Sequence, residues 1–193
     1  MGIDCYRPAA TKYRPERMRV LFVCESPPYA GQGRRPAYFF FEDNPRGDVL
    51  FATIVAGLYD LAYRKDPVRK AELLTRMKDD GTWLIDAVEY PINADENGPI
   101  KEARRNEIIQ ENLSDLLRRL GGLRKCGCID ERTRLILIKK NIYELLHEPL
   151  RQAGYDVVNS GAVPFPHYHR DRETVRGIRT VLARHGLLRS RKG

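Results

Sequence analysis

The chain has 193 residues, of which 42% are hydrophobic, and 34 Lys and Arg residues against 26 Asp and Glu residues give it a net charge of +8. This length and apolar content are enough for one domain with a sizeable core and exclude long disorder, and apolar runs as short as Leu135–Ile138 exclude a membrane span. The N-terminus lacks the apolar stretch of a signal peptide, so we expect a cytoplasmic protein, and the positive charge favours an anionic partner, most commonly nucleic acid.

Four short apolar segments, rich in β-branched or aromatic residues, have the character of buried strands. They are, in chain order, Arg19–Cys24, Trp83–Val88, Leu135–Lys139 and Tyr155–Asn159. Apolar residues at three-to-four spacing predict helices between and after them, over 49–61, 108–120, 141–152 and 172–185, the third disturbed by Pro149. This alternation predicts a three-layer α/β/α fold with a central four-stranded, mainly parallel sheet.

The whole chain, 1–193, is expected to form a single domain and a monomer, with a basic tail at about 188–193 that frays. None of the four cysteines form a C-x-x-C pair, and Cys126-Gly127-Cys128 is too tight for the usual zinc hairpin. Cys24 ends an apolar strand and is expected to be a small buried residue. We therefore expect no metal and no cofactor.

The residues that follow each predicted strand are the first candidates for a site, because ligands of parallel sheets bind beyond the carboxyl ends of the strands. The first strand is followed by Glu25, Ser26, Pro27 and Pro28. A carboxylate on a loop stiffened by two prolines is suited to orient a water molecule or to stabilise a developing cation. The alternative is a Glu that caps a helix or forms an ion pair.

An aromatic run, Tyr38–Phe41, lies downstream of Arg34 and Arg35. A helix or strand buries only about half of such a run, so at least one ring should face a cleft or solvent. Exposed aromatic rings beside arginines are suited to stacking on a nucleic-acid base. The alternative for any single ring is a plain core anchor.

Asp86 interrupts the second apolar strand. A buried carboxylate needs hydrogen-bond partners or a shifted pKa. Two roles fit equally well: Asp86 reads the N–H donors of a ligand, or it holds the backbone amides of a neighbouring loop.

The fourth strand leads into a proline-rich turn that carries Pro166, His167, His169 and Arg170, with Arg172 at the start of the last predicted helix. Histidine can donate a hydrogen bond to a developing anion, and arginine at a helix start suits phosphate. One of the two histidines is expected to act and the other to be a surface residue.

These features, in this order from about residue 20 to residue 184, resemble the uracil-DNA glycosylase superfamily. Cys24-Glu25-Ser26-Pro27-Pro28 is similar to the family's first motif, closest to its G-E-A-P-G form, without the four cysteines of the iron–sulfur members. Leu84-Ile85-Asp86-Ala87-Val88 is similar to its L-L-N-A-V segment, with Asp in place of Asn, and Phe39 falls where the family stacks a Phe on the base. Phe165-Pro166-His167-Tyr168 matches the last motif in position only.

The resemblance implies DNA repair by a hydrolase that flips a uracil or other damaged base out of the stack and cleaves its N-glycosidic bond. Phe39 and Pro27 would bind the base and Asp86 would read its edge. Glu25, with Ser26, would orient water or stabilise the cation-like sugar, and His167 or His169 would stabilise the departing base. Phosphate contacts would come from Arg34, Arg35, Arg170 and Arg172, with Pro166 in the loop that wedges into DNA.

Three departures from the family pattern keep two alternatives open. Ser26 stands where some relatives hold a water-activating Asp or Asn, Phe165 stands where the family has its His, and an ionised Asp86 cannot donate as Asn does. One alternative is a catalytically inactive nucleic-acid-binding module with the same fold. The other is an α/β enzyme that acts on free nucleotides or nucleosides.

Overall fold

The computed structural model describes residues 5–29, 31, 36–44, 48–63, 66–166 and 171–188. Its helices are α1 (Tyr6–Lys12), α2 (Val49–Tyr59), α3 (Pro67–Asp79), α4 (Glu102–Glu111), α5 (Leu113–Lys125), α6 (Lys140–Gln152) and α7 (Asp171–Arg184). Its strands are β1 (Val20–Cys24), β2 (Thr82–Asp86), β3 (Ala94–Asp95), β4 (Gly98–Pro99), β5 (Arg134–Leu137) and β6 (Asp156–Val157).

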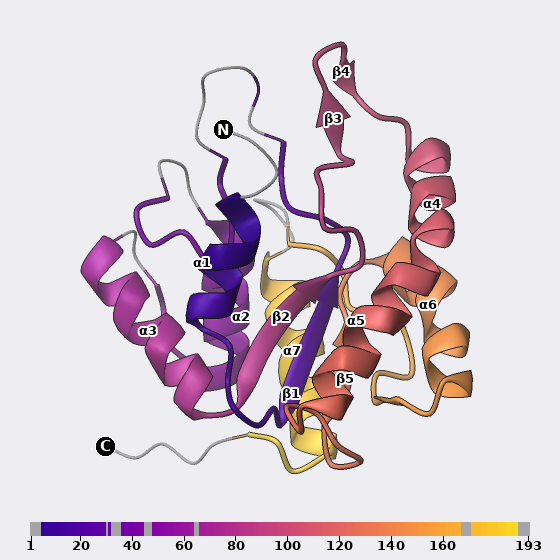
Figure 1. Ribbon diagram of the computed structural model, residues 1–193. Coiled ribbons are helices and arrows are strands. Elements are labelled where there is room, and N and C mark those ends of the chain that lie inside the picture. Colours follow the sequence, from indigo (N-terminus) through magenta and orange to yellow (C-terminus); the bar gives the residue numbers. More distant parts are fainter. Residues whose placement is uncertain are drawn as a thin grey trace.

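The central sheet has four strands in the order β2-β1-β5-β6, and every pairing in it is parallel (Figure 1). Leu21 of β1 lies opposite Trp83 of β2 and Leu135 of β5. The five residues of β1 and the five of β2 are all buried, as expected of strands that are covered on both faces. The predicted α/β/α fold with a four-stranded parallel sheet is therefore confirmed.

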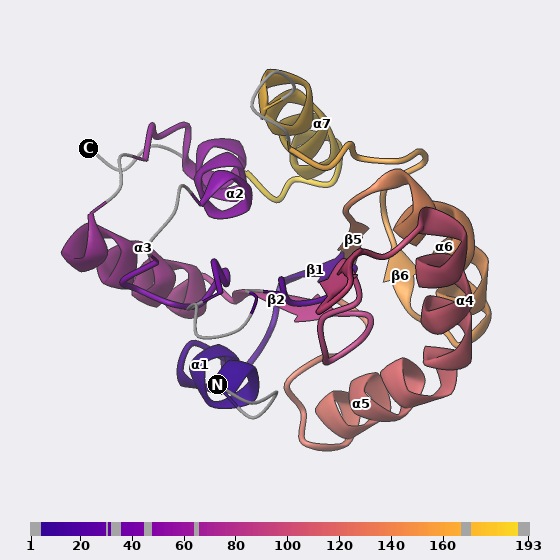
Figure 2. The same cartoon turned by 90° about the horizontal axis from the view of Figure 1, so that it is seen from above.

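Helices cover both faces of this sheet (Figure 2). Helices α2 and α7 lie side by side on one face, and α1 and α5 lie on the other, with α3 beside β2 and α6 beside β5 and β6. The α2–α7 contact is close because position 57 is a glycine: a Cβ atom there would lie 2.6 Å from Cγ2 of Ile178. The buried apolar side chains form one contiguous core around the sheet.

Two predicted helices differ from the observed ones. The periodic segment 108–120 is divided between α4 and α5, because the side chain of Asn112 donates to the carbonyl of Ile108 (2.8 Å) and ends α4. Helix α6 continues through Pro149 to Gln152, although this proline has no N–H group to donate to the preceding turn.

Three elements were not predicted: α1, α3 and the short β3–β4 hairpin. Among the described residues, no helix is long and apolar enough to cross a membrane.

Candidate functional site

The strand order places a topological switch point between β1 and β5. In the strand order β2-β1-β5-β6, the strand that follows β1 in the chain lies toward one edge of the sheet, and the strand that follows β5 lies toward the opposite edge. In parallel α/β sheets, the crevice at the carboxyl ends of such a strand pair is where ligands bind. Glu25, directly after β1, and Lys139, directly before α6, lie at this crevice.

Three polar side chains surround the carboxylate of Glu25. Lys139 Nζ donates to Oε2 at 2.6 Å, and Asn141 Nδ2 donates to Oε1 at 2.9 Å. Arg105 Nε lies 3.9 Å from Oε1. Glu25 is 8% exposed, so a buried carboxylate is held at the switch point by groups that come from α4 and from the start of α6. The sequence left open whether Glu25 acts on a ligand or forms an ion pair. The structure shows the ion pair, with Lys139.

The polar cluster around Glu25 is incompletely satisfied. Asn141 Nδ2 also donates to Asn106 Oδ1 at 2.9 Å, but the buried Oδ1 atom of Asn141 has no hydrogen-bond partner among the described residues. The same is true of the buried Nε–H group of Arg105. Buried polar atoms are nearly always hydrogen-bonded in folded proteins. One free acceptor and one free donor beside a held carboxylate are therefore suited to meet polar groups of a ligand.

Lys139 has a backbone conformation that is rare outside glycine, with φ 90° and ψ 143°. A side chain in such a region costs on the order of 1–3 kcal/mol. Hydrogen bonds from Ile138 N to Val23 O (3.0 Å) and from Lys139 N to Val163 O (2.8 Å) hold the backbone in this conformation. Strain of this kind is concentrated at functional sites, because the rest of the fold must stabilise it.

The loop after β1 is fixed against the segment after β2. Val88 N donates to Glu25 O (3.0 Å), Ile92 N donates to Ser26 Oγ (3.4 Å) and Tyr29 N donates to Asn93 Oδ1 (2.8 Å). The hydroxyl of Ser26 thus accepts a backbone hydrogen bond, which is a structural role, whereas the sequence suggested a catalytic one.

Asp86, at the end of β2, is 8% exposed. Its pKa is raised to about 7: burial is the largest cause, and the carboxylates of Glu25 and Glu89 add to it, while Arg119 and the Tyr38 hydroxyl that is hydrogen-bonded to it lower the pKa. Arg119 donates to the backbone carbonyls of Asp86 (3.0 Å) and Ala87 (2.7 Å). Asp86 therefore changes its protonation state near neutral pH.

A cleft of about 730 Å³ lies between α1 and α5, over β2. Pockets for small molecules and cofactors have volumes of about 300–1,000 Å³, so this cleft is large enough for a nucleotide. Pro27 and Asp86, both predicted to bind a base, line it, and so does Tyr38. Arg7, Arg14, Arg118 and Arg119 also line it, and three of them form ion pairs: Arg7 with Glu89 (2.8 Å), and Arg118 and Arg119 with Asp115.

Phe39, predicted to stack on a base, lies in the core instead. It is 3% exposed, and its ring packs edge-on against Phe40 (4.9 Å between centroids) and Phe51 (5.3 Å). The aromatic residue of this run that lines the cleft is Tyr38. The assignment of Phe39 to base stacking is therefore corrected: the run Tyr38–Phe41 forms a turn in which Phe41 N donates to Tyr38 O (3.1 Å), and within it Tyr38 faces the cleft.

Pro166, predicted in a loop that wedges into DNA, is buried, so its ring is not available for insertion. Arg172 is exposed near the start of α7, where it lines a shallow hollow of about 360 Å³ with Arg176 and Arg179. The remaining predicted residues, Arg34, Arg35, His167, His169 and Arg170, and most of the basic tail lie outside the described residues.

Sequence reasoning missed three members of the Glu25 cluster: Lys139, Asn141 and Arg105. A signal for the first two was present, because Lys139-Lys140-Asn141 follows a predicted strand and belongs to the same edge of the sheet as Glu25. Arg105 lies in α4, and no local pattern connects it to that edge.

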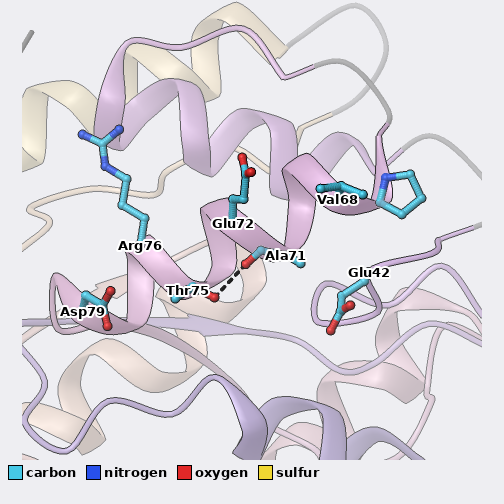
Figure 3. Close-up of a pocket in the computed structure, with 8 residues that line it drawn as sticks. Glu42, Val68, Ala71, Glu72, Thr75, Arg76 and Asp79 are labelled. Carbon is cyan, nitrogen blue, oxygen red and sulfur yellow. Dashed lines mark hydrogen bonds between the residues drawn. The ribbon is translucent and has the colours of Figure 1, made fainter.

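A further hollow of about 700 Å³ lies along the outer surface of α3 (Figure 3). It is lined by Val68, Ala71, Thr75 and Arg76, with the carboxylates of Glu42, Glu72 and Asp79 around them. This acidic, wide-open surface is remote from the strand ends and would repel phosphate, so we do not assign the functional site to it.

Comparison of the chain with protein-family models, with curated proteins and with solved structures found no match in any of the three. The site is therefore interpreted from its own geometry.

Proposed function

We propose that this protein removes a uracil or other damaged base from DNA by hydrolysing its N-glycosidic bond. The observation that carries the proposal is the carboxylate of Glu25, held at the strand switch point by Lys139 (2.6 Å) and Asn141 (2.9 Å) beside a second buried carboxyl group, Asp86, at the next strand end. The resemblance of the strand-end segments to the uracil-DNA glycosylase superfamily supports the same activity.

In this reaction the bond between the sugar and the base breaks, the base leaves with the electron pair, and the sugar carbon becomes cation-like. A water oxygen bonds to that carbon, and the proton that the water loses neutralises the departing base. A fixed negative charge next to that carbon stabilises the transition state without having to reorganise. Glu25 meets this requirement because its donors restrain both of its oxygens. The same carboxylate can orient the attacking water.

Recognition of the base falls to Asp86 and the neighbouring Tyr38. With its pKa at about 7, Asp86 is protonated in an appreciable fraction of molecules at neutral pH, and a protonated carboxyl group donates one hydrogen bond while it accepts another. That pattern is complementary to a base edge with a carbonyl oxygen next to an N–H group, such as the edge of uracil. Protonation thus removes the mismatch that an ionised Asp in place of Asn would cause.

Arginines near the cleft and on α7 are suited to contact the phosphates of the DNA backbone. Arg7 and Arg118 are 75% and 70% exposed at the cleft, and Arg172 and Arg176 are exposed on one side of α7. Each phosphate contact makes the affinity fall more steeply as the salt concentration rises, so binding should depend strongly on salt.

The test is release of a base from labelled oligonucleotides that carry uracil, hypoxanthine, xanthine or an oxidised pyrimidine. We expect the wild-type protein to release at least one of these bases and Glu25→Gln to lower that rate by about 10²–10³-fold, as for the loss of one electrostatic stabiliser. Glu107→Gln, on the exposed surface of α4, is the matched control and should keep the wild-type rate. Equal rates for wild type and Glu25→Gln would overturn the role of Glu25.

One observation favours a second candidate, a catalytically inactive module that binds nucleic acid. The hydroxyl of Ser26 is occupied by a backbone amide, and both oxygens of Glu25 already accept hydrogen bonds. Salt-dependent binding to oligonucleotides without release of any base would support this candidate and contradict the proposed hydrolysis.

A further inference from the structure

Two of the four cysteines of the chain lie in near contact at the end of α5. The Sγ atoms of Cys126 and Cys128 are 2.7 Å apart. A disulfide bond is about 2.05 Å long, so only a small movement separates the two thiols from bond formation. Gly127, between them, has φ 74°, a left-handed conformation that glycine adopts without strain and that turns the second thiol back toward the first.

Backbone hydrogen bonds hold both cysteines in this turn. Cys126 N donates to Gly122 O (3.1 Å), and Cys128 N donates to Leu123 O (2.9 Å). On the other side, Met18 N donates to Cys128 O at 2.7 Å, which ties the turn to the start of β1. The backbone of this turn is therefore fixed in a form that brings the two cysteine side chains together.

The two thiols have different surroundings. Cys126 is exposed and lines the cleft between α1 and α5, whereas Cys128 is 8% exposed. The pKa of Cys126 lies below its ordinary value because of the hydrogen bond from the Cys128 thiol, with a contribution from the positive charge of Arg14. Burial raises the pKa of Cys128. An accessible thiol of lowered pKa beside a protected thiol is the arrangement of an attacking and a resolving cysteine.

We propose that Cys126 and Cys128 form a reversible dithiol–disulfide site that reacts with hydrogen peroxide. The Cys126 thiolate attacks one peroxide oxygen, the O–O bond breaks, and Cys126 becomes a sulfenic acid while hydroxide leaves. The Cys128 sulfur then attacks the Cys126 sulfur, a disulfide forms and, with the Cys128 proton, a water molecule leaves. Each thiol gives up one electron, and one peroxide is reduced to two water molecules in total. This site goes beyond the proposed base excision and does not rest on it.

The position of the pair indicates what the disulfide would do. It closes a ring of only three residues, and such a short loop removes little conformational entropy from the unfolded chain, so the bond is not a stabilising staple. Instead, oxidation removes an ionisable thiol from the wall of the cleft, near Arg14. The redox state of this turn therefore changes the charge that the wall of the cleft can carry.

The test uses the full-length protein, reduced with dithiothreitol, freed of the reductant and then treated with hydrogen peroxide. Free thiols are alkylated under denaturing conditions and the peptides are analysed by mass spectrometry. We expect two of the four thiols to escape alkylation, the peptide with Cys126 and Cys128 to be lighter by two hydrogen atoms, and dithiothreitol to restore both thiols.

Three variants separate this pair from general oxidation of cysteines. Cys128→Ser should accumulate a sulfenic acid on Cys126 that dimedone labels, and Cys126→Ser should lose peroxide reactivity at this turn by about tenfold or more. Cys24→Ser, at a buried position in β1, is the control and should form the disulfide like the wild type. Full alkylation after peroxide, a disulfide that involves Cys5, or unchanged reactivity of Cys126→Ser would each overturn the proposal.

Discussion

Two of the lysine–carboxylate pairs in this protein, Lys70–Asp48 and Lys139–Glu25, differ in almost every physical respect. Lys70 is fully buried in α3, pairs with Asp48 and donates to Phe41 O at 2.7 Å, with its ammonium group 4.8 Å from the centre of the Phe51 ring. Lys139 has a side chain 23% exposed and pairs with Glu25 at 2.6 Å from a strained backbone, beside buried polar atoms that have no hydrogen-bond partner in the described part of the chain.

The difference separates a pair whose hydrogen bonds are complete from a pair that lies beside strained backbone and unsatisfied polar atoms. Every donor of Lys70 has a partner, since Tyr38 O also accepts from it at 3.5 Å, and the pair fixes the segment that carries the aromatic run. Around Lys139, in contrast, strain and unsatisfied groups remain. Proteins retain such local violations mainly at functional sites. The comparison thus agrees with a structural role for the first pair and with the functional role that we propose for the second.

The largest expected effect is on the Lys70–Asp48 pair. Lys70→Ala leaves the buried carboxylate of Asp48 without its cation and should lower the free energy of unfolding by about 3–5 kcal/mol. The double variant Lys70→Met/Asp48→Leu removes both charges and should recover most of that loss. Urea denaturation of the wild type and of each variant measures these free energies of unfolding. An equal loss for Lys139→Ala, where the pair is partly exposed, would contradict the assignment of the two pairs to different roles.

A second expected effect concerns Asp86, the carboxyl group beside the Glu25 pair. Its pKa is raised to about 7 in the folded state, against about 3.9 in the unfolded chain, so the folded protein binds more protons between these values. The free energy of unfolding should therefore fall as pH rises from about 4 to about 7, by up to about 4 kcal/mol from this group.

Asp86→Asn cannot be ionised and should lose that part of the pH dependence. The variant should be more stable than the wild type at pH 8, and this advantage should disappear toward pH 4, as measured by urea denaturation at a series of pH values. A wild-type curve that rises over this range, or an identical slope in the variant, would show that Asp86 is not the group whose pKa is raised. Base release should also weaken above pH 7 in the wild type if protonated Asp86 recognises the base.

The sequence predicted the sheet well because each strand is a short apolar run whose signal is local, and the strand-end rule led directly to Glu25 and Asp86. The sequence also contains a recognisable start for α3, an Asp followed by a Pro, which the prediction did not use. In the structure, the side chain of Asp66 accepts from Val68 N at 2.9 Å.

The missed parts depend on contacts between residues far apart in the chain. The choice between Tyr38 and Phe39 follows from how Lys70 and Asp48 fix the backbone of that segment, and four successive aromatic residues look alike to any pattern. The pairing of Glu25 with Lys139 joins residues 114 positions apart. No periodicity shows such a pairing before the fold brings the two strand ends together.

The smallest expected effect is also the most direct test of strain at Lys139. Glycine tolerates φ 90° without a steric penalty, so Lys139→Gly loses the ion pair but relieves the backbone, whereas Lys139→Met loses the ion pair and keeps the strain. Lys139→Gly should therefore be more stable than Lys139→Met by about 1 kcal/mol in urea denaturation.

At Lys140, in the first turn of α6, the order of the two substitutions should be reversed, because glycine is less favourable than methionine in a helix by up to about 1 kcal/mol. Both variants at position 139 should release bases more slowly than the wild type, since Glu25 loses its nearest donor in each. A stable Lys139→Gly protein with reduced base release would show that the lysine is kept in this strained position for the site. If Lys139→Met proved as stable as Lys139→Gly, the backbone at this position would carry no strain. Strain could then no longer support a functional role for the Lys139–Glu25 pair.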